Sequence, residues 1–235
     1  MIQEDAMRYR RIAAALAAAV LCTGLCSCSG IKKDEPSAAS EIVVNADGVG
    51  DLIEPPEDDP EYNLGTYRYS ASGVKLYYEE ENYPTDLLLF IEKLFSTYPA
   101  RDYDTYRSCI HPTYVEAMEE YLPKEFDYDL NTSFTNRCDT LNVQMGGSYR
   151  ITRIRATVPM DGDFSDAFFD QLTPICGEGY GAKIREDSDK VYCVQFDIMV
   201  QTDEEGAGEQ IFFNNSDKGM GIVIVLKDGQ YYAFC

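Results

Sequence analysis

Histidine chemistry in this chain depends on one residue, because His111 is the only histidine among 235 residues. A zinc site needs three or four ligands, and the sequence contains no Cys-x-x-Cys pair that supplies the others. A catalytic dyad of Cys109 and His111 is not expected either. The two residues are two positions apart, and residues at that spacing do not share a helix face. His111 precedes Pro112, which is most simply a loop between helices. The sequence therefore predicts no metal site and no cofactor, and His111 remains a candidate ligand-binding residue.

Two arginines at a spacing of two form a second candidate site. Residues two apart in a strand point to one face, which would place Arg153 and Arg155 beside Tyr149 and Ile151. Paired guanidinium groups bind carboxylates or phosphates. The alternative is that both arginines pair with acidic residues on neighbouring strands. The candidate ligand-binding residues are Tyr149, Arg153, Arg155 and His111.

Cysteine chemistry is open to only a few residues, since five cysteines follow position 28: Cys109, Cys138, Cys176, Cys193 and Cys235. An odd number leaves at least one thiol outside any intramolecular disulfide. Most of them lie on apolar stripes, as buried free cysteines do. Cys193 and Cys235 lie on late segments that we expect to be neighbouring strands, so this pair is the candidate disulfide.

The N-terminus has the pattern of an export signal. A basic stretch with Arg8, Arg10 and Arg11 precedes the uncharged segment 12–25. Such a segment of 14 residues is shorter than the ~20 that span a bilayer as a helix, which is typical of a signal peptide. The rest of the sequence has no apolar run of that length.

The segment Leu25-Cys26-Ser27-Cys28 resembles the cleavage site of bacterial lipoproteins. It has a branched apolar residue three positions before Cys28 and a small residue directly before it. The alternatives Cys22 and Cys26 each follow a leucine, where a small residue is wanted. The resemblance implies a signal peptide at 1–27, a lipid on Cys28, and a protein anchored to the cell membrane on its extracytoplasmic face.

The net charge is −21, with 41 acidic residues against 20 basic ones. Nucleic acids and anionic membrane surfaces attract a Lys/Arg excess, so we expect no nucleic-acid partner. Residues 28–61 are acidic and contain four prolines, a composition that predicts a disordered tether. A calcium loop is the alternative, but the required spacing is missing from its candidate ligands Asp47, Asp51, Asp58 and Asp59.

Apolar periodicity divides residues 62–235 into elements. Spacings of three and four predict helices at 85–98, after Asp102, from a capping box at Thr113 to Pro123, at 134–145 and at 164–176. Alternation predicts strands at 149–158, 192–200 and 220–226, and a short hairpin at 67–78. Asp228-Gly229 is a two-residue hairpin signal. Helices followed by a strand, a helix and an antiparallel meander predict a single α+β domain.

Several segments of this domain resemble extracytoplasmic lipoproteins with a cystatin-like or nuclear transport factor two-like fold. They are the segment 146–151 (Gly-Gly-Ser-Tyr-Arg-Ile), the helix at 164–176, the strand at 190–196 and the closing hairpin at 225–232. The resemblance covers about residues 84–235 and departs from the pattern at Tyr231, where such domains commonly carry Trp. It implies N-terminal helices packed on a curved antiparallel sheet. That fold hosts enzymes, binders and interaction modules, so it implies no function by itself.

Two functions from different classes remain. One is a non-catalytic ligand-binding or protein-interaction module, with an unknown protein or small molecule as its partner. The other is a small isomerase- or dehydratase-like enzyme that uses the cone between sheet and helices. A deep cone that contains His111, or an Asp beside a Tyr, would favour the enzyme. A cone filled by side chains would favour the binding module.

Overall fold

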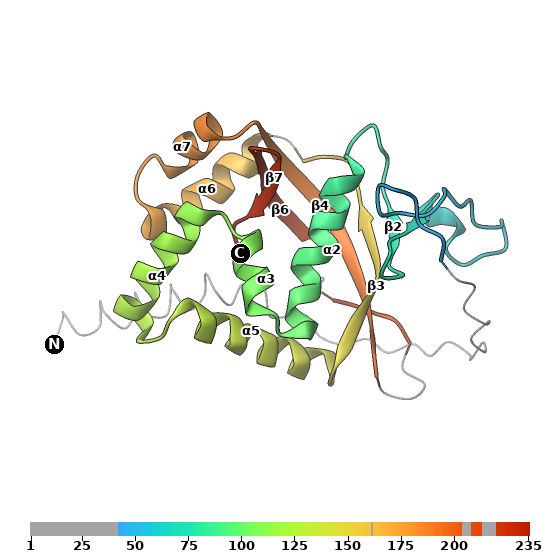
Figure 1. Ribbon diagram of the computed structural model, residues 1–235, viewed down its shortest axis with the longest axis horizontal. Coiled ribbons are helices and arrows are strands. Elements are labelled where there is room, and N and C mark those ends of the chain that lie inside the picture. Colours follow the sequence, from blue (N-terminus) through green and yellow to red (C-terminus); the bar gives the residue numbers. More distant parts are fainter. Residues whose placement is uncertain (1–41, 161, 204–207, 213–219) are drawn as a thin grey trace.

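The computed structural model describes residues 42–235 apart from 161, 204–207 and 213–219. The predicted signal peptide, Cys28 and the predicted tether up to residue 41 lie outside the described residues. The strands are β1 (Arg68–Tyr69), β2 (Lys75–Tyr77), β3 (Tyr149–Ala156), β4 (Lys190–Thr202), β5 (Gln210–Ile211), β6 (Met220–Lys227) and β7 (Gln230–Ala233). The helices are α2 (Thr85–Ala100), α3 (Tyr103–Cys109), α4 (Pro112–Phe126), α5 (Leu130–Met145), α6 (Gly162–Cys176) and α7 (Tyr180–Asp187) (Figure 1).

The strands form one seven-stranded sheet in the order β1-β2-β3-β4-β6-β7, and β5 pairs with β4. The helices and the sheet make this an α+β arrangement, as predicted. All pairs are antiparallel except β2 with β3, which run parallel with Leu76 opposite Ile154. The predicted sheet was antiparallel throughout. The difference arises because β2 and β3 are joined by four helices, and only such a long crossover lets neighbouring strands run in the same direction.

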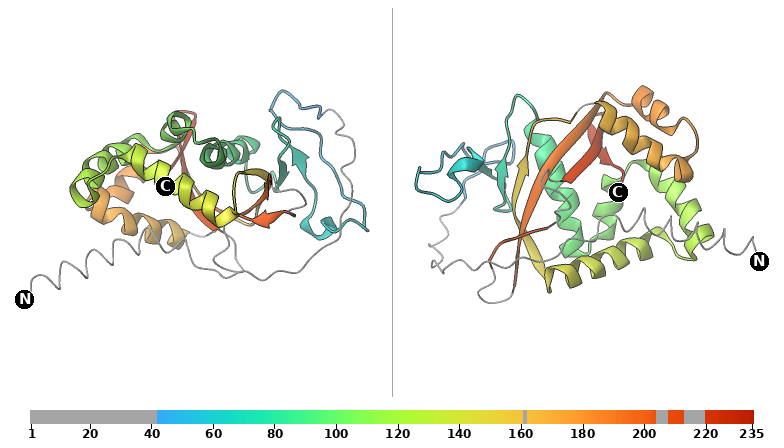
Figure 2. Two further views of the ribbon diagram at one scale, coloured as in Figure 1. Left: turned by 90° about the horizontal axis from the view of Figure 1, so that it is seen from below. Right: turned by 180° about the vertical axis from the view of Figure 1, so that it is seen from behind.

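Helix α2 packs on one face of the sheet. On β4 the alternate residues Tyr192, Val194, Phe196, Ile198 and Val200 are buried, and Phe95 of α2 packs on Phe196. In the view from behind, α2 lies beyond the sheet, whereas α6 and α7 lie at one end of it (Figure 2). Strand β4 therefore has one fully apolar face, which packs against the first helices of the domain.

Helix α2 confirms the clearest periodic prediction of the sequence. It spans Thr85–Ala100 and buries a stripe that includes Leu87, Ile91, Leu94 and Tyr98. The shorter α3 begins at the N-cap Asp102, whose carboxylate accepts a hydrogen bond from the backbone N–H of Thr105. Asp129 caps α5 in the same way. A side-chain acceptor at this position satisfies a backbone donor that the helix cannot pair internally.

Helix α4 differs from its prediction at both ends. Its N-cap is His111 rather than Thr113, and Pro112 takes the first helical position, where a missing N–H costs nothing. The expected end at Pro123 is wrong, because the helix continues to Phe126. Leu122 is buried and Phe126 packs against the core, so tertiary packing offsets the hydrogen bond that proline removes.

The turn predictions are confirmed, whereas one helix was missed. Helix α5 ends at Gly146, which has a left-handed φ of 82°. Asp228 and Gly229 both have positive φ, 52° and 74°, and connect β6 to β7, as a type I′ hairpin turn requires. The periodicity did not reveal α7, a helix of eight residues of which only Tyr180 and Ile184 are buried.

Residues 42–61, called the arm below, lie against the sheet, where the composition predicted the disordered tether to continue. Val49 is fully buried and forms an isolated bridge with Ser70, and Ile53 forms another with Tyr67. The arm is followed by a 3-10 turn, η1 (Tyr62–Leu64). A few apolar side chains at wide spacing were enough to place this acidic segment on the domain, so the boundary predicted at residue 61 is too late.

Candidate functional site

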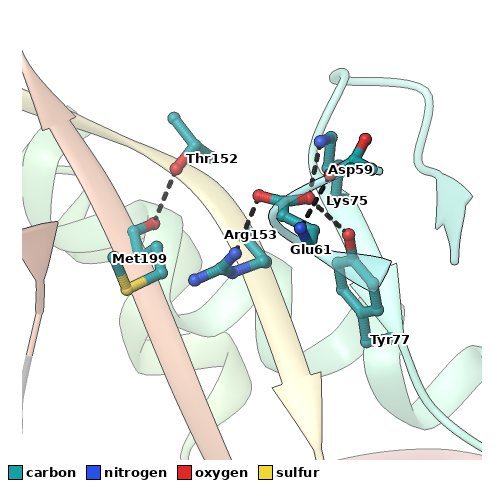
Figure 3. A network of polar contacts seen from close by, with 7 residues as sticks. All are labelled: Asp59, Glu61, Lys75, Tyr77, Thr152, Arg153 and Met199. Atoms are coloured by element: carbon teal, nitrogen blue, oxygen red, sulfur yellow. Dashed lines mark hydrogen bonds and ion pairs between the residues drawn. The ribbon is translucent and has the colours of Figure 1, made fainter. Parts of the chain in front are cut away.

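Strand β3 positions the predicted arginines, and a β-bulge decides where they point. The register against β4 shifts between Ile151 and Arg153, and the hydroxyl of Thr152 donates to the carbonyl of Met199 at 3.2 Å (Figure 3). Before the bulge Tyr149 and Ile151 are buried, whereas after it the buried positions are Ile154 and Ala156. One extra residue exchanges the two faces of a strand.

The prediction that Arg153 and Arg155 share a face with Tyr149 is therefore wrong. Arg153 and Arg155 are half-buried on the side opposite Ile154 and Ala156. Arg155 lies across the ladder from Asp197, and Arg153 pairs with an acidic residue of the arm. The alternative prediction was pairing with acidic residues on neighbouring strands, but the acidic partner of Arg153 lies outside the strands.

The acidic partner of Arg153 is Glu61, at the end of the arm. Arg153 Nη1 donates to Glu61 Oε1 at 2.8 Å. Lys75 Nζ and Tyr77 Oη donate to the other oxygen, Oε2, at 2.7 and 2.5 Å. Figure 3 shows these side chains converging on one carboxylate from β2 and β3. We call these four residues the carboxylate clamp, and its donors Lys75, Tyr77 and Arg153 the donor set.

The clamp keeps Glu61 ionised. Burial alone would raise the pKa of Glu61, but hydrogen bonds from Lys75 and Tyr77 and the charges of Lys75 and Arg153 lower it below its ordinary value. Burial and the Glu61 carboxylate in turn raise the pKa of the Tyr77 hydroxyl. Both carboxylate oxygens accept at least one charge-assisted or phenolic hydrogen bond, which is the strong class of such contacts.

Signals for this clamp in the sequence are weak. Lys75 and Tyr77 stand two apart in the predicted hairpin, which places both on one face of a strand. Glu61 was assigned to the tether, where one acidic residue cannot be distinguished from the others. Which acidic residue pairs with Arg153 depends on long-range contacts, because 92 positions separate Glu61 from Arg153.

His111 lies in a different part of the fold. Its side chain is 1% exposed, its ring stacks on Phe234 with centroids 5.4 Å apart, and Nδ1 lies 2.9 Å from the hydroxyl of Thr113. That hydroxyl lies 3.0 Å from the phenol oxygen of Tyr180. Nε2 makes no hydrogen bond to any described residue, and burial lowers the pKa of His111. The structure does not bring this neutral imidazole to Arg153.

The space between the sheet and the helices α2, α3 and α5 is filled by aromatic rings. The Phe134 centroid lies 4.6 Å from that of Tyr106 and 5.7 Å from that of Tyr98. Tyr149 lies here too, 5.4 Å from Phe212. We call this cluster the aromatic interior, and each of its members is at most 5% exposed: Phe95, Tyr98, Tyr106, Phe134, Tyr149, Phe196 and Phe212. Tyr149 is therefore a core residue.

The candidate disulfide between Cys193 and Cys235 is not formed. Cys193 alternates with the buried residues Tyr192 and Val194, so it points away from the aromatic interior. Cys235 lies on the other side, where the phenol of Tyr106 donates to its carbonyl and burial raises the pKa of its thiol to about 11. The sheet itself separates the two thiols, which strand order alone could not show.

A small hollow of about 230 Å³ lies beside the arm. Its lining includes Leu52, Tyr78 and Arg68, together with the acidic residues Glu79, Glu80 and Glu81. Arg68 is already paired with Glu80 at 2.5 Å. None of the ligand-binding residues predicted from the sequence lines this hollow, so it offers no support for their grouping.

The described residues contain neither a cluster of metal ligands nor a membrane-spanning helix. No group of three His, Cys, Asp or Glu side chains there is arranged to hold a metal ion. No helix in the same part of the chain is both long and apolar enough to cross a membrane. The carboxylate clamp is therefore the polar site that these residues define best.

Comparison with known proteins adds no relative: no protein-family model, no curated protein and no solved structure matches this chain.

Proposed function

We propose that this chain is a lipoprotein anchored to the cell membrane on its extracytoplasmic face, with a non-catalytic ligand-binding or protein-interaction module as its folded part. The anchor is supported by the basic stretch, the short apolar segment 12–25 and the site at Leu25–Cys28. The acidic segment after Cys28 then separates the domain from the bilayer.

The finer description of the fold is part of this proposal. Helices α2 to α5 precede β3 and the later strands of the sheet, and α6 and α7 lie between β3 and β4. This order and the helices packed across the sheet in Figure 1 are compatible with a cystatin-like or nuclear transport factor two-like domain. The parallel β2–β3 pair and the arm are additions to the pattern that the sequence suggested.

The observation that best supports a non-catalytic function is the aromatic interior. The cone in which an enzyme of this fold would hold its substrate is occupied by Phe134, Tyr98 and Tyr106, which pack on one another. Catalysis there would require a cavity beside a group that transfers protons. The rings instead supply apolar contact area, which stabilises a scaffold for a surface site.

One observation favours the alternative enzyme. A buried imidazole nitrogen without a described partner, Nε2 of His111, is an uncommon feature in native structures. Its other nitrogen is held by Thr113, which in turn lies beside Tyr180. An isomerase- or dehydratase-like function would use this nitrogen as its base.

Metabolic labelling tests the anchor. Cells that express the full chain are fed a clickable fatty acid, and the N-terminal peptide is read by mass spectrometry. We expect label on Cys28 and its loss in Cys28→Ser, whereas Cys26→Ser should keep it because Leu25 and Ser27 still frame the site. Label retained on Cys28→Ser would contradict the anchor.

A further inference from the structure

The carboxylate clamp has a fixed half and a less firmly held half. The donor set lies on two hydrogen-bonded strands, with Lys75 opposite Arg153 and Tyr77 opposite Arg155 in the ladder. The acceptor, Glu61, belongs to the arm, which is joined to the sheet by two isolated bridges. The η1 turn that follows Glu61 has no buried residue. The donors are therefore preorganised by strand pairing. The earlier part of the arm is anchored by the fully buried Val49, whereas Glu61 lies eight positions beyond Ile53, the last bridged residue of the arm.

Two of the three donors are also within reach of solvent. The side chains of Arg153 and Lys75 are 16% and 28% exposed and that of Glu61 is 20% exposed, whereas Tyr77 is 1% exposed. Two cations and a phenol that converge on one carboxylate resemble a binding site with its ligand in place, because each donor is directed at a specific oxygen. The arm also contributes Asp59, whose carboxylate accepts from the backbone N–H of Glu61 at 2.7 Å, so departure of the arm would remove two negative charges from the donors.

We propose that the donor set is a carboxylate-binding site that Glu61 fills in the free protein and that a ligand's carboxylate enters by displacing Glu61. This inference rests on the binding function proposed above and names its ligand class. The net charge of −21 repels polyanions, so the ligand carries a carboxylate on an otherwise neutral or basic body. The C-terminal carboxylate of a basic peptide has this chemistry.

Chemical rescue by acetate tests the donor set directly. Glu61→Ala in the full chain leaves a carboxylate-sized space between the donors, and acetate is titrated while the thermal unfolding midpoint is measured against sodium chloride at equal ionic strength. We expect acetate to raise the midpoint of Glu61→Ala saturably, since a ligand that binds only the folded state stabilises it. The wild-type chain should show no such rise, and Arg153→Met added to Glu61→Ala should abolish it.

Two matched variants control for general effects of acetate. Asp139→Ala empties an exposed ion pair with Arg101 whose side chains are 44% and 60% exposed, and it should give no rise. Glu61→Gln fills the same space with an amide and should not respond either. An acetate response that is absent in folded Glu61→Ala, or equal in Asp139→Ala, overturns the site.

Displacement of Glu61 is tested on the unaltered chain, which removes any dependence on the folding of a variant. Isothermal titration calorimetry compares a lysine tripeptide that has a free C-terminal carboxylate with the same peptide amidated at that end. We expect the free carboxylate to bind at least about tenfold more tightly, and Arg153→Met to remove the difference. Equal affinities would overturn displacement. Neither measurement involves Cys28, so its outcome is separable from that of the lipid-labelling experiment.

Discussion

The aromatic interior and the carboxylate clamp lie on opposite sides of β3 and hold the fold in different ways. The interior distributes its contacts over seven rings from helices and strands, each at most 5% exposed. The clamp concentrates three hydrogen bonds on Glu61. Loss of one ring leaves the other rings in contact, whereas loss of one carboxylate releases every donor. Apolar packing is thus redundant and strong, while the polar contact is weaker but specific.

The largest effect is expected from a cavity in the interior. Phe196 is fully buried and packs against Phe95 with ring centroids 5.4 Å apart. Phe196→Ala should lower the free energy of unfolding by about 3–5 kcal/mol, from lost transfer free energy and from the cavity. Urea unfolding followed by circular dichroism measures this. If Phe196→Ala lost no more stability than Glu61→Ala, the conclusion that the interior is stronger than the clamp would be wrong.

A smaller loss is expected from the clamp. Glu61→Ala removes a carboxylate that binds two cations, and hydrogen bonds to charged groups contribute about 1.5–3 kcal/mol each in favourable cases. Because the side chain is 20% exposed, we expect the whole change to cost about 1–2 kcal/mol. The exposed Arg101–Asp139 pair provides the reference, since solvent screens it and Asp139→Ala should cost less than Glu61→Ala. Equal losses in the two variants would show that the clamp is an ordinary surface pair.

The turn at Gly229 lies in neither region, and it provides a reference for the effect of a local backbone change on stability. Gly229 has a φ of 74° in the turn between β6 and β7, where a β-branched side chain is strained. Gly229→Val should cost about 1–2 kcal/mol, measured by the same urea titration. Gly229→Asn, which tolerates left-handed φ, should cost less. Equal stability of Gly229→Val and the wild type would contradict the type I′ turn.

The smallest effects are expected from pH, where a second buried acid contrasts with the clamp. Glu92 of α2 is 7% exposed and accepts from Ser70 at 3.0 Å and from Ser72. Burial raises its pKa, and the two serine hydrogen bonds oppose this only in part. No described cation pairs with its carboxylate. Glu61 and Glu92 are therefore acids whose pKa values shift in opposite directions.

Linkage gives the two acids opposite pH dependence. The contribution of Glu61 is complete above the ordinary carboxyl pKa of 4.5 and is lost as the pH falls through its lower folded pKa. The contribution of Glu92 is complete below 4.5 and is lost as the pH rises through its raised pKa. At neutral pH, Glu61→Gln should therefore destabilise the protein and Glu92→Gln should stabilise it. Urea unfolding at neutral and acidic pH checks this, and shifts of the same sign would contradict it.

The helices and most strands could be predicted because apolar periodicity is local. Leu87, Ile91 and Leu94 recur at helical spacing, and the alternation along β4 fixes its buried face from the sequence alone. The predictions that were wrong concern features that depend on non-local packing. Pro123 stays inside α4 because residues beyond it pack on the core, and the parallel β2–β3 pair depends on a crossover through four helices.

The clamp could be predicted only in fragments. Arg153 was identified as a candidate anion-binding residue, but the bulge at Thr152 reversed its face, and a bulge leaves no simple trace in an alternating pattern. Glu61 was one acid among many in a proline-rich segment. The five cysteines show the same limit, because alternation placed Cys193 on a strand but could not show on which side of the sheet Cys235 would lie.

The parallel pairing of β2 with β3 also sets an order for folding. Glu61 meets Arg153 only when the long intervening chain closes as a loop, which is entropically costly. Contacts of this sequence separation form slowly. The edge of β2 therefore stays open after the hairpin with β1 has formed, and charged Lys75 discourages another chain from pairing there. In hydrogen exchange, the amides of β1 and β2 should lose protection before those of β4 and β6.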